Sequence, residues 1–342
     1  MRITAVTCVK NEGPFLIEWI AFNRVIGVTD FLFYSNDCSD GTDMLLEALA
    51  ARGIVTHLPN PARGRNYQME ALKDARRQQV VRAADWLWVA DVDEFLNIHV
   101  GDGTIPELIE ACGTPQAISV TFQFFANGGI ERFEDKPVIA QFEHSHNPDI
   151  WTDQTAIEVK TLIRKDFPVK YHGAHRPFMR NNIAQNKLPD WKDGSGRPVP
   201  AAFRDAAHKN RLRKFPARGA RRHATLNHYA LRSLDSYLVK NDRGDVNREH
   251  RAFDDSYWRE RNDPAWRDTS IQRYLPRLQA EMARLMDEEI AALHQEAVRR
   301  HRARRDALLT QPAYREMREK LRAAPTISPQ EEALLALIGG AP

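Results

Sequence analysis

Asp91, Asp93 and Glu94 are the residues whose types and spacing point most directly to chemistry. They follow the apolar run 86–90, and ligands of open α/β sheets collect beyond the carboxyl ends of such buried strands. Three crowded carboxylates repel one another unless a cation lies between them, and hard oxygen ligands favour Mg²⁺ or Mn²⁺. The pattern therefore predicts a metal site together with the phosphates that the metal would carry. An acidic turn in solvent is the alternative for an isolated Asp-x-Asp.

Two polar turns, residues 11–14 and 35–42, are expected at the same edge of the sheet. Each follows a predicted strand that should neighbour the carboxylate-bearing strand, so the polar groups of all three segments converge. Side-chain amides and small residues in such turns can approach a base and a ribose closely. Asp40 is expected to cap the next helix, whereas helix capping does not explain the presence of Asn36 and Asp37.

The elements that must position these residues alternate between strand and helix over the first hundred residues. Strands are predicted at 3–9, 31–34, 54–57 and 86–90. Segments with apolar residues at helical spacing separate them, the last of these over 67–83. This alternation is typical of a parallel sheet, and it predicts a nucleotide-binding half-domain.

The rest of the chain is less regular. A helix is predicted at 105–111 and strands at 117–125 and 159–164, whereas 180–222 shows no hydrophobic period and is expected to be a lid, a binding loop or disordered. From Ile271 the apolar residues recur at three and four, which predicts an amphipathic helix. We expect this helix to pack on the catalytic domain or on its copy in a homodimer. The basic run 299–305 leaves a membrane-surface contact as the alternative.

Composition sets limits on the class of protein. The chain has 342 residues, 42% of them hydrophobic, and a formal charge of +3 from 49 basic and 46 acidic residues, which is too balanced to predict nucleic-acid binding. The three cysteines are widely spaced, which argues for a reducing compartment and against zinc. With no signal-like start and no apolar run of about 18 residues, we expect a cytoplasmic protein, peripheral at the inner membrane surface in the alternative view.

The motifs together resemble family 2-like glycosyltransferases of the GT-A fold. The chain carries Asn36-Asp37-Cys38-Ser39-Asp40-Gly41-Thr42 and Asp91-Val92-Asp93-Glu94-Phe95, which is similar to a bacterial branch with Asn-Asp-Cys-x-Asp-Gly-Thr and Asp-Val-Asp-Glu-Phe. The resemblance covers residues 3–240. It implies an α/β, Rossmann-like three-layer sandwich with a mostly parallel central sheet. It also implies a catalytic domain over 1–245, with a nucleotide-sugar half (1–100) and an acceptor half (101–245), and a helical C-terminal extension over 246–342.

The resemblance also implies roles for individual residues. Those expected to bind the nucleotide-sugar donor are Val9, Asn11, Glu12, Asn36, Asp37, Asp91, Lys240 and Arg243. Those expected to hold a divalent metal, Mn²⁺ or Mg²⁺, are Asp91 and Asp93, completed by His175 or His228. The chain departs from the family at Ser35 and Asn36, where many members carry two acidic residues.

The catalytic base is expected on the acceptor side, where no segment reproduces the motif of the family. Candidate carboxylates are Glu131, Glu134, Asp149, Asp153 and Glu158. We choose Asp153, because it precedes a strand and follows Trp151, whose ring suits stacking on a sugar. Basic residues of the loop could neutralise a diphosphate or contact an anionic acceptor: Lys209, Arg211, Arg213, Lys214, Arg218, Arg221 and Arg222.

These features predict a metal-dependent glycosyltransferase of hexosyltransferase type that transfers a sugar with inversion from a nucleotide-diphosphate sugar, a UDP-sugar being the expected donor. The acceptor is expected to be a hydroxyl of a glycan or a lipid-linked saccharide. A nucleotidyltransferase is one alternative, but it needs a phosphate-cradling Gly-rich loop after the first strand, and residues 11–14 are a poor one. A non-catalytic nucleic-acid or membrane-surface binder is the other.

Overall fold

The computed structural model describes residues 1–64, 66–148, 156–205, 212, 214–216, 218–244, 255–326 and 329–338. The first half contains β1 (Ile3–Val9), α1 (Gly13–Val25), β2 (Asp30–Ser35), α2 (Thr42–Ala51), β3 (Thr56–Pro59), α3 (Tyr67–Ala75), α4 (Gln79–Arg82), β4 (Trp86–Val89), β5 (Glu94–Ile98), α5 (Ile105–Ala111) and β6 (Ala117–Phe124). Among these elements, helices separate the first four strands, as the sequence predicts.

The second half begins with short elements around one long strand. They are α6 (Val138–Gln141), β7 (His144–Ser145), β8 (Ala156–Arg164), β9 (Val169–Tyr171), β10 (Phe178–Met179), η1 (Gln185–Lys187), β11 (Trp191–Asp193), α7 (Ala201–Arg204), β12 (Lys214–Pro216), β13 (Ala224–His228), α8 (Leu234–Arg243), α9 (Asp255–Arg259) and β14 (Trp266–Arg267). Helices then follow to the end: η3 (Ser270–Tyr274), α10 (Leu275–Leu285), α11 (Glu288–Leu309), α12 (Pro312–Arg322) and α13 (Pro329–Leu337).

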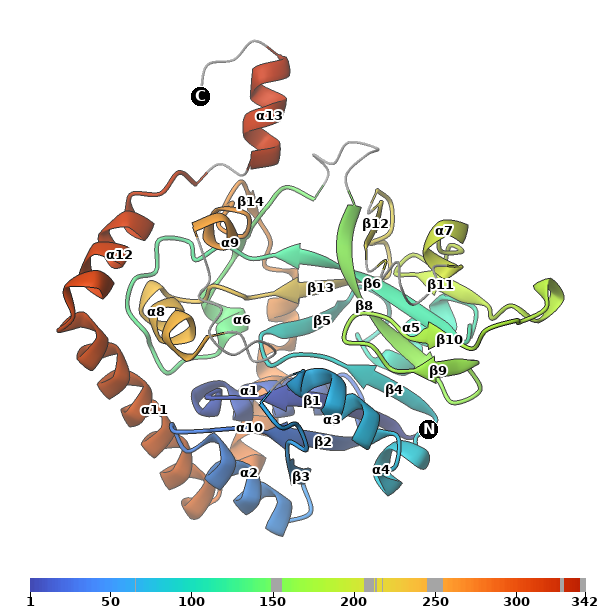
Figure 1. The fold of residues 1–342 in the computed structure, drawn as a ribbon, viewed down its shortest axis with the longest axis horizontal. Helices are drawn as coiled ribbons and strands as arrows, with labels where there is room; N and C mark the ends of the chain where they lie inside the picture. Colours follow the sequence, from blue (N-terminus) through green and yellow to red (C-terminus); the bar gives the residue numbers. More distant parts are fainter. Residues whose placement is uncertain are drawn as a thin grey trace.

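Ten strands of the described residues form one central sheet, in the order β3-β2-β1-β4-β8-β6-β13-β5, with β11 beside β6 and β12 beside β8 (Figure 1). The strands β3, β2, β1 and β4 run parallel, whereas β8 runs antiparallel to both β4 and β6. The carboxyl ends of β2, β1 and β4 therefore open onto one edge. This confirms the convergence that the sequence predicts for the three polar segments.

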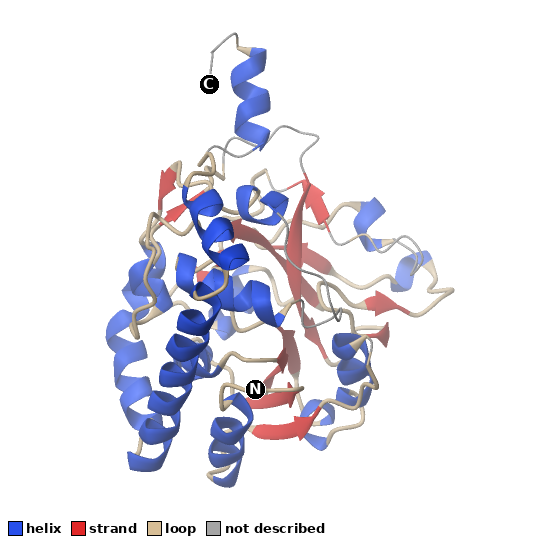
Figure 2. Cartoon of the chain, turned by 60° about the vertical axis from the view of Figure 1, so that its left-hand side comes forward, coloured by secondary structure: helices blue, strands red, loops and turns tan. Residues whose placement is uncertain are grey.

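Helices cover both faces of the sheet (Figure 2). Side chains of one strand alternate between two cores. In β1, Ile3 and Ala5 belong to the core beneath α1, while Val6 and Cys8 belong to the core beneath α3. The predicted architecture is confirmed: an α/β three-layer sandwich with a mostly parallel central sheet and a helical C-terminal part. Among the described residues, no helix is both long and apolar enough to cross a bilayer.

Two boundaries in the first half differ from the prediction. The third strand lies at 56–59 rather than 54–57, and the helix expected over 67–83 is two helices, α3 and α4. The break is a turn in which the N–H of Arg77 donates to the carbonyl of Asp74, and Gln78 then adopts an extended conformation. The apolar periodicity continues across this turn, so the sequence pattern alone does not show the break.

The segment 180–222 contains more structure than predicted. β11 extends the central sheet beside β6, β12 pairs with β8, and α7 lies between them in sequence. Trp191, Phe203 and Phe215 of this segment are buried in the second core. The guanidinium of Arg176 lies 5.0 Å from the Trp191 ring and 4.3 Å from the Phe203 ring. Widely separated aromatic residues packed around a cation leave no period in the sequence, which explains why the sequence pattern does not show these elements.

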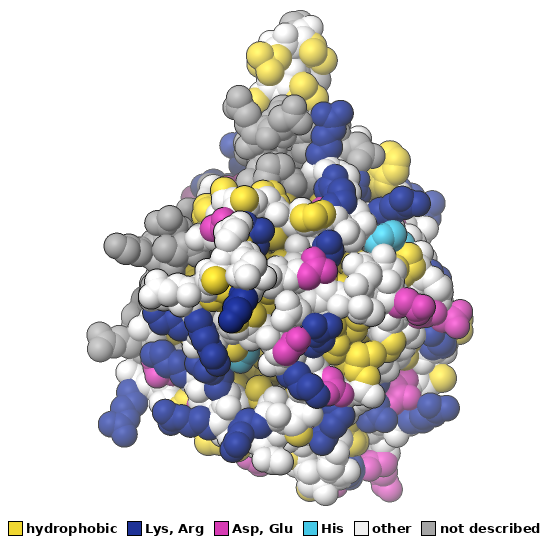
Figure 3. Space-filling view, turned by 90° about the vertical axis from the view of Figure 1, so that its right-hand side faces the viewer, with side chains coloured by type: hydrophobic (Ala, Val, Ile, Leu, Met, Phe, Trp, Pro, Cys, Tyr) yellow, Lys and Arg dark blue, Asp and Glu magenta, His cyan; other side chains and the backbone are white. Residues whose placement is uncertain are grey.

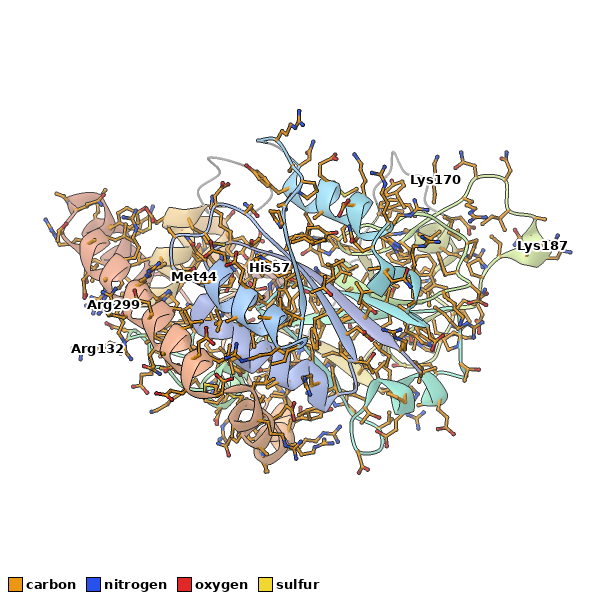
Figure 4. The ribbon with its side chains drawn as sticks, turned by 90° about the horizontal axis from the view of Figure 1, so that it is seen from below. Met44, His57, Arg132, Lys170, Lys187 and Arg299 are labelled. Atoms are coloured by element: carbon orange, nitrogen blue, oxygen red, sulfur yellow. The ribbon has the colours of Figure 1, made fainter. Side chains whose placement is uncertain are left out.

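The C-terminal helices pack on helices that cover the central sheet and on α8. The expected single helix is divided into α10 and α11, because Asp287 caps a new helix by accepting a hydrogen bond from the N–H of Ile290 at 2.9 Å. α10 packs on α1, and α11 contacts α1, α2 and α8. Figure 4 shows α2, marked by Met44, beside α11, marked by Arg299.

The basic run on α11 is bound within the chain. Arg304 forms two hydrogen bonds of 2.7 Å with Asp242, and Arg305 forms one of 2.5 Å with Asp235; both acids belong to α8. Arg299 and Arg300 pair with Glu296, one helical turn away. Arg304 and Arg305 therefore dock α11 on α8, whereas Arg299 and Arg300 form ion pairs within α11.

Candidate functional site

The turn after β4 carries the acidic motif. Asp91 and Asp93 lie between β4 and β5, and Glu94 begins β5. The N–H of Asp91 donates to Glu94 Oε2 at 3.0 Å, and the N–H of Glu94 donates to the carbonyl of Asp91 at 3.0 Å. Since β5 pairs antiparallel with β13, Glu94 lies opposite His228. The turn thus fixes three carboxylates beside an imidazole.

A buried lysine neutralises one side of this turn. Lys160 of β8 is 0% exposed, and its Nζ lies 2.9 Å from Asp91 Oδ2 and 3.2 Å from Glu94 Oε2. Burial opposes the charge of Lys160, but Asp91 and Glu94 raise the pKa of its ammonium above the ordinary value. Burial raises the pKa of Glu94 well above its ordinary value despite Lys160, because Asp91 and Asp93 add repulsion. The other oxygen of Asp91 accepts from Gln68 Nε2 at 3.3 Å.

A second lysine binds Asp93. Lys240 Nζ, from α8, lies 2.8 Å from Asp93 Oδ2 and donates to the carbonyl of Ala230 at 2.8 Å. His228 Nε2 lies 3.5 Å from the other oxygen of Asp93, Oδ1. Burial opposes the charge of Asp93, yet Lys240 and His228 hold its pKa well below the ordinary value. Asp93 is therefore a carboxylate with one oxygen bound by a cation and one facing an imidazole.

Glu12, in the turn after β1, is held by two arginines. Arg243 of α8 lies 2.5 Å from Glu12 Oε1, and Arg232 lies 2.8 Å from Glu12 Oε2. Burial opposes ionisation of Glu12, but Arg243 and Arg232 keep its pKa below the ordinary value. Arg243 also donates to the carbonyls of Lys10 and Asn11. The polar turn after β1 and helix α8 are thus joined across the mouth of the sheet.

A cavity of about 250 Å³ opens between these groups. The predicted site residues that line it are Glu12, Asp91, Asp93, His175, His228, Lys240 and Arg243. They come from the turns after β1 and β4, from the segment after β9, and from β13 and α8. The fold therefore brings together seven predicted residues that span more than two hundred positions of the chain.

The other predicted donor residues lie outside this lining. Val9 is buried within β1, and Asn36 is buried in the turn after β2. Asn11 binds that second turn: its Oδ1 accepts from the N–H of Ser39 at 2.8 Å. Asn11 and Asp37 adopt the left-handed backbone conformation, with φ of 52° and 46°, which Asn and Asp tolerate better than most residues. The left-handed backbone geometry is therefore a structural reason for an Asn at position 11 and an Asp at position 37.

Asp40 lies one residue before Gly41, the N-cap of α2, and binds the first N–H of that helix from outside the N-cap position. Its Oδ1 accepts from the N–H and the hydroxyl of Thr42 at 2.9 and 2.6 Å, and its Oδ2 accepts from the N–H of Gly13 at 3.0 Å. The N–H of Glu12 donates to Thr42 Oγ1 at 2.9 Å. Asp40 and Thr42 therefore accept hydrogen bonds from the turn after β1, so the N–H groups of Glu12 and Gly13 already have partners within the chain.

The candidate bases are scattered. Asp149 and Asp153, with Trp151, lie outside the described residues. Glu131 pairs with Arg318 and Arg322 of α12, and Glu134 pairs with Lys136. Glu158, on β8, lines the cavity. Among the described carboxylates considered from sequence, Glu158 is thus the one at the site.

The basic loop does not reach the cavity in the part that the structure describes. Lys214, Arg218, Arg221 and Arg222 are absent from the lining, while Lys209, Arg211 and Arg213 lie outside the described residues. Lys and Arg side chains are spread over the side of the molecule that carries β9 and β10 (Figure 3). Lys170 and Lys187, from β9 and η1, mark that side in Figure 4.

Several residues at or beneath the site have no role predicted from the sequence. Lys160, buried beneath the acidic turn, occurs in a matched motif, but nothing in the sequence shows that it bridges Asp91 and Glu94. Tyr257 and Arg261 line the cavity from beyond residue 245, with the Arg261 guanidinium 3.9 Å from the centre of the Tyr257 ring. Only the pairing of β8 with β4 and the packing of α9 bring these residues to the site.

The donor atoms present fit a divalent cation. Among the described residues, Asp93, Glu94 and His228 each offer one ligand atom, and these atoms lie within 4.8 Å of one another. Carboxylate oxygens and an imidazole nitrogen suit ions of the Mn²⁺ class. Lys240 binds Asp93 Oδ2 while His228 faces Oδ1, so one oxygen can stay paired with the ammonium while the other binds a metal ion. Asp91 and His175 line the cavity outside this group, and their role as ligands stays a prediction.

Comparison with solved structures finds low similarity. TarS residues 1–349 from S. aureus align with a TM-score of 0.33 and 9% identity, over 94% of this chain and 91% of that one. Glucosyl-3-phosphoglycerate synthase from Mycobacterium tuberculosis, in complex with Mn²⁺, UDP and glucosyl-3-phosphoglycerate, aligns with a TM-score of 0.26 and 16% identity, over 49% and 58% of the chains. At these values we draw no conclusion from either structure.

Sequence comparison identifies the family. A glycosyltransferase family 92 protein of Ricinus communis is 29% identical over 100 residues, and one of Oryza sativa subsp. japonica is 28% identical over 107 residues. The matches cover 28% and 30% of this chain and 17% of each relative, so the chain spans about a sixth of their length. The model of glycosyltransferase family 92 matches residues 4–189. This match leaves the narrower resemblance to the family 2-like branch untested. The chain belongs to glycosyltransferase family 92.

Proposed function

We propose that this chain transfers a sugar from a nucleoside-diphosphate sugar to a hydroxyl group of a glycan or lipid-linked acceptor, with inversion and with a divalent cation. A UDP-sugar is the donor that the sequence motifs favour. The observation that carries the proposal is the cavity itself, in which Asp93 and Glu94 face His228 while Lys240 and Arg243 of α8 lie at the same opening.

The cations of α8 are suited to bind a diphosphate. Lys240 and Arg243 are spaced one helical turn apart, and both line the cavity. Charge-assisted hydrogen bonds to phosphate are stronger than neutral ones, and they strengthen further as the leaving group gains charge. Before the donor binds, the charge of each side chain is already paired with a carboxylate. Each side chain would exchange this carboxylate partner for a phosphate oxygen.

Asp93 and His228, with Glu94, would hold the cation, and Asp91 and His175 are further proposed ligands. A bound Mn²⁺ or Mg²⁺ would supply charge neutralisation to the diphosphate leaving group. Lys160 keeps Asp91 and Glu94 in place beneath it. The carboxylates next to the donor therefore serve binding, and the acceptor's proton must be taken by a group elsewhere. Asp153, outside the described residues, remains the base proposed from sequence.

The competing functions lack a matching feature. A nucleotidyltransferase would cradle phosphates with free N–H groups after the first strand, but the N–H of Glu12 and of Gly13 are bound by Thr42 and Asp40. A membrane- or nucleic-acid-binding role would use the basic run of α11, whose arginines form ion pairs within the chain. Both observations favour glycosyl transfer.

Thermal denaturation with nucleotides tests the donor site, because a ligand that binds only the native state raises its stability. We expect UDP with Mn²⁺ to raise the melting temperature more than UDP or Mn²⁺ alone, and more than GDP or CMP with Mn²⁺. The double variant Asp91→Asn with Asp93→Asn should lose the shift. An unchanged shift in that variant, or no shift with any nucleotide, would refute the proposed site.

A further inference from the structure

We propose that Arg232 is a positioning residue that fixes the backbone of the acidic turn, so that Asp93 keeps the orientation in which it would bind the divalent cation. The inference rests on the proposed metal-dependent transfer and concerns a residue to which the sequence assigns no role. Arg232 lies between β13 and α8, and its side chain is 7% exposed. It is absent from the lining of the cavity, so it must act through the residues that it holds.

Arg232 adopts a backbone conformation that arginine rarely takes. Its φ is 54°, in the left-handed region, where residues other than glycine, asparagine and aspartate are uncommon. The next residue, Ser233, is the N-cap of α8, and its hydroxyl accepts from the N–H of Ser236 at 3.1 Å. Unfavourable backbone conformations persist only where the surrounding structure holds them, and they cluster at functional sites. The strained residue lies where the chain passes from β13 into the helix that carries Lys240 and Arg243.

The guanidinium of Arg232 joins two turns at the edge of the sheet. Nη1 donates to Glu12 Oε2, in the turn after β1, at 2.8 Å, and Nη2 donates to the carbonyl of Val92, in the acidic turn, at 3.3 Å. The guanidinium carbon lies 3.5 Å from the centre of the Phe15 ring. A planar guanidinium packed on a ring directs its two bonds at fixed angles, which a lysine ammonium does not. Arg232 therefore fixes the acidic turn relative to the turn after β1.

The bond to Val92 acts on Asp93, because that carbonyl belongs to the peptide unit that joins these two residues. On the other side of Asp93, its own carbonyl accepts from the N–H of Tyr229 at 2.8 Å. The segment 229–232 thus holds the backbone of Asp93 both before and after its Cα. Groups that orient a metal ligand contribute to metal affinity, and the loss of one typically lowers that affinity by about 10–100-fold. We expect the same of Arg232.

The test measures the dissociation constant of Mn²⁺ by electron paramagnetic resonance, with saturating UDP and at a temperature where each variant is folded. Arg232→Met should raise this constant by about 10–100-fold. Arg232→Lys keeps a positive charge beside Glu12, but its ammonium cannot supply both bonds in the geometry of a guanidinium. Its dissociation constant should therefore lie between those of Arg232→Met and the wild type.

Arg176→Met is the matched control. Arg176 is also a buried arginine that packs on aromatic rings and donates to a main-chain carbonyl, but it does not line the cavity. Both methionine variants should lower the free energy of unfolding in urea, because each loses buried hydrogen bonds. The dissociation constant of Mn²⁺ should rise in Arg232→Met and stay within about twofold of the wild type in Arg176→Met.

The outcomes separate positioning from general stability. A wild-type affinity for Mn²⁺ in Arg232→Met or in Arg232→Lys overturns the inference, and so does an equal loss of affinity in Arg176→Met. If Arg232→Met does not fold, a dissociation constant above that of the wild type in Arg232→Lys supports the inference. If the wild-type chain binds no Mn²⁺ with UDP, the proposed metal-dependent function itself is wrong, and the inference fails with it.

Discussion

The polar turns after β1 and β2 and the acidic turn after β4 open onto one edge of the sheet, yet they use their polar groups differently. In the first region Asn11, Asp40 and Thr42 bind backbone groups of the neighbouring turn. In the second, Asp91 and Asp93 bind the ammonium groups of Lys160 and Lys240. Side chains that are hydrogen-bonded to the backbone hold the turns at this edge of the sheet together. Carboxylates that are paired with lysine can exchange that partner for a ligand.

The largest effect is expected from removing the buried cation of the second region. Lys160→Met leaves Asp91 and Glu94 side by side without a partner, so we expect a loss of about 3–5 kcal/mol in the free energy of unfolding, measured in urea. Lys165→Met is the matched control, because the Lys165–Asp85 pair is largely exposed; its loss should be about 0–1 kcal/mol. Equal losses in the two variants would contradict the role of Lys160.

Glu12→Gln should have the next largest effect, and one that depends on pH. The folded-state pKa of Glu12 is depressed, so its stabilising contribution is present above the unfolded value of about 4.3 and is lost as the pH falls through the folded value. The variant should be less stable than the wild type at pH 7, with a difference that shrinks below about pH 4. Equilibrium unfolding at several pH values measures this.

Glu110→Gln provides the comparison for that series, because Glu110 is exposed on α5. We expect the unfolding free energy of this control to differ from that of the wild type by less than about 0.5 kcal/mol across the pH range. A difference between Glu12→Gln and the wild type that stays constant down to pH 2 would mean that the two arginines do not depress the Glu12 pKa.

Asp40→Ala should affect the first region alone and by the smallest amount. It removes the acceptor of three hydrogen bonds, so a loss of about 2 kcal/mol in unfolding free energy is expected. The affinity for UDP with Mn²⁺ should stay within about threefold, as read by calorimetric titration. If the affinity instead fell as far as in Asp93→Asn, the distinction between the two regions would be wrong.

The sequence predicts the convergence of the three polar segments, since it depends only on parallel strands and the turns that follow them. It also predicts that Asp40 binds the start of the next helix, although the N-cap position itself is Gly41. It does not predict that Lys160 reaches Asp91, because this contact depends on β8 entering the sheet antiparallel beside β4. Tyr257 and Arg261 are likewise invisible, since α9 reaches the cavity only through packing of the C-terminal part.

The same reasoning explains the weaker predictions. Asn11 and Asp37 have the residue types of a ligand site, but each occupies a left-handed backbone position that favours these types. Arg304 and Arg305 of α11 resemble part of a surface patch in sequence, and only the fold shows that α8 supplies their acidic partners. Local composition indicates charge, while the partner of each charge is set by tertiary structure.

A crystal structure with UDP and Mn²⁺ tests most directly whether the cavity between α8 and the acidic turn is the donor site. We predict that diphosphate oxygens lie within about 2.7–3.2 Å of Lys240 Nζ or an Arg243 guanidinium nitrogen, with the cation bound by Asp93. A nucleotide bound at the turns after β1 and β2, with its phosphates away from α8, would contradict the proposal.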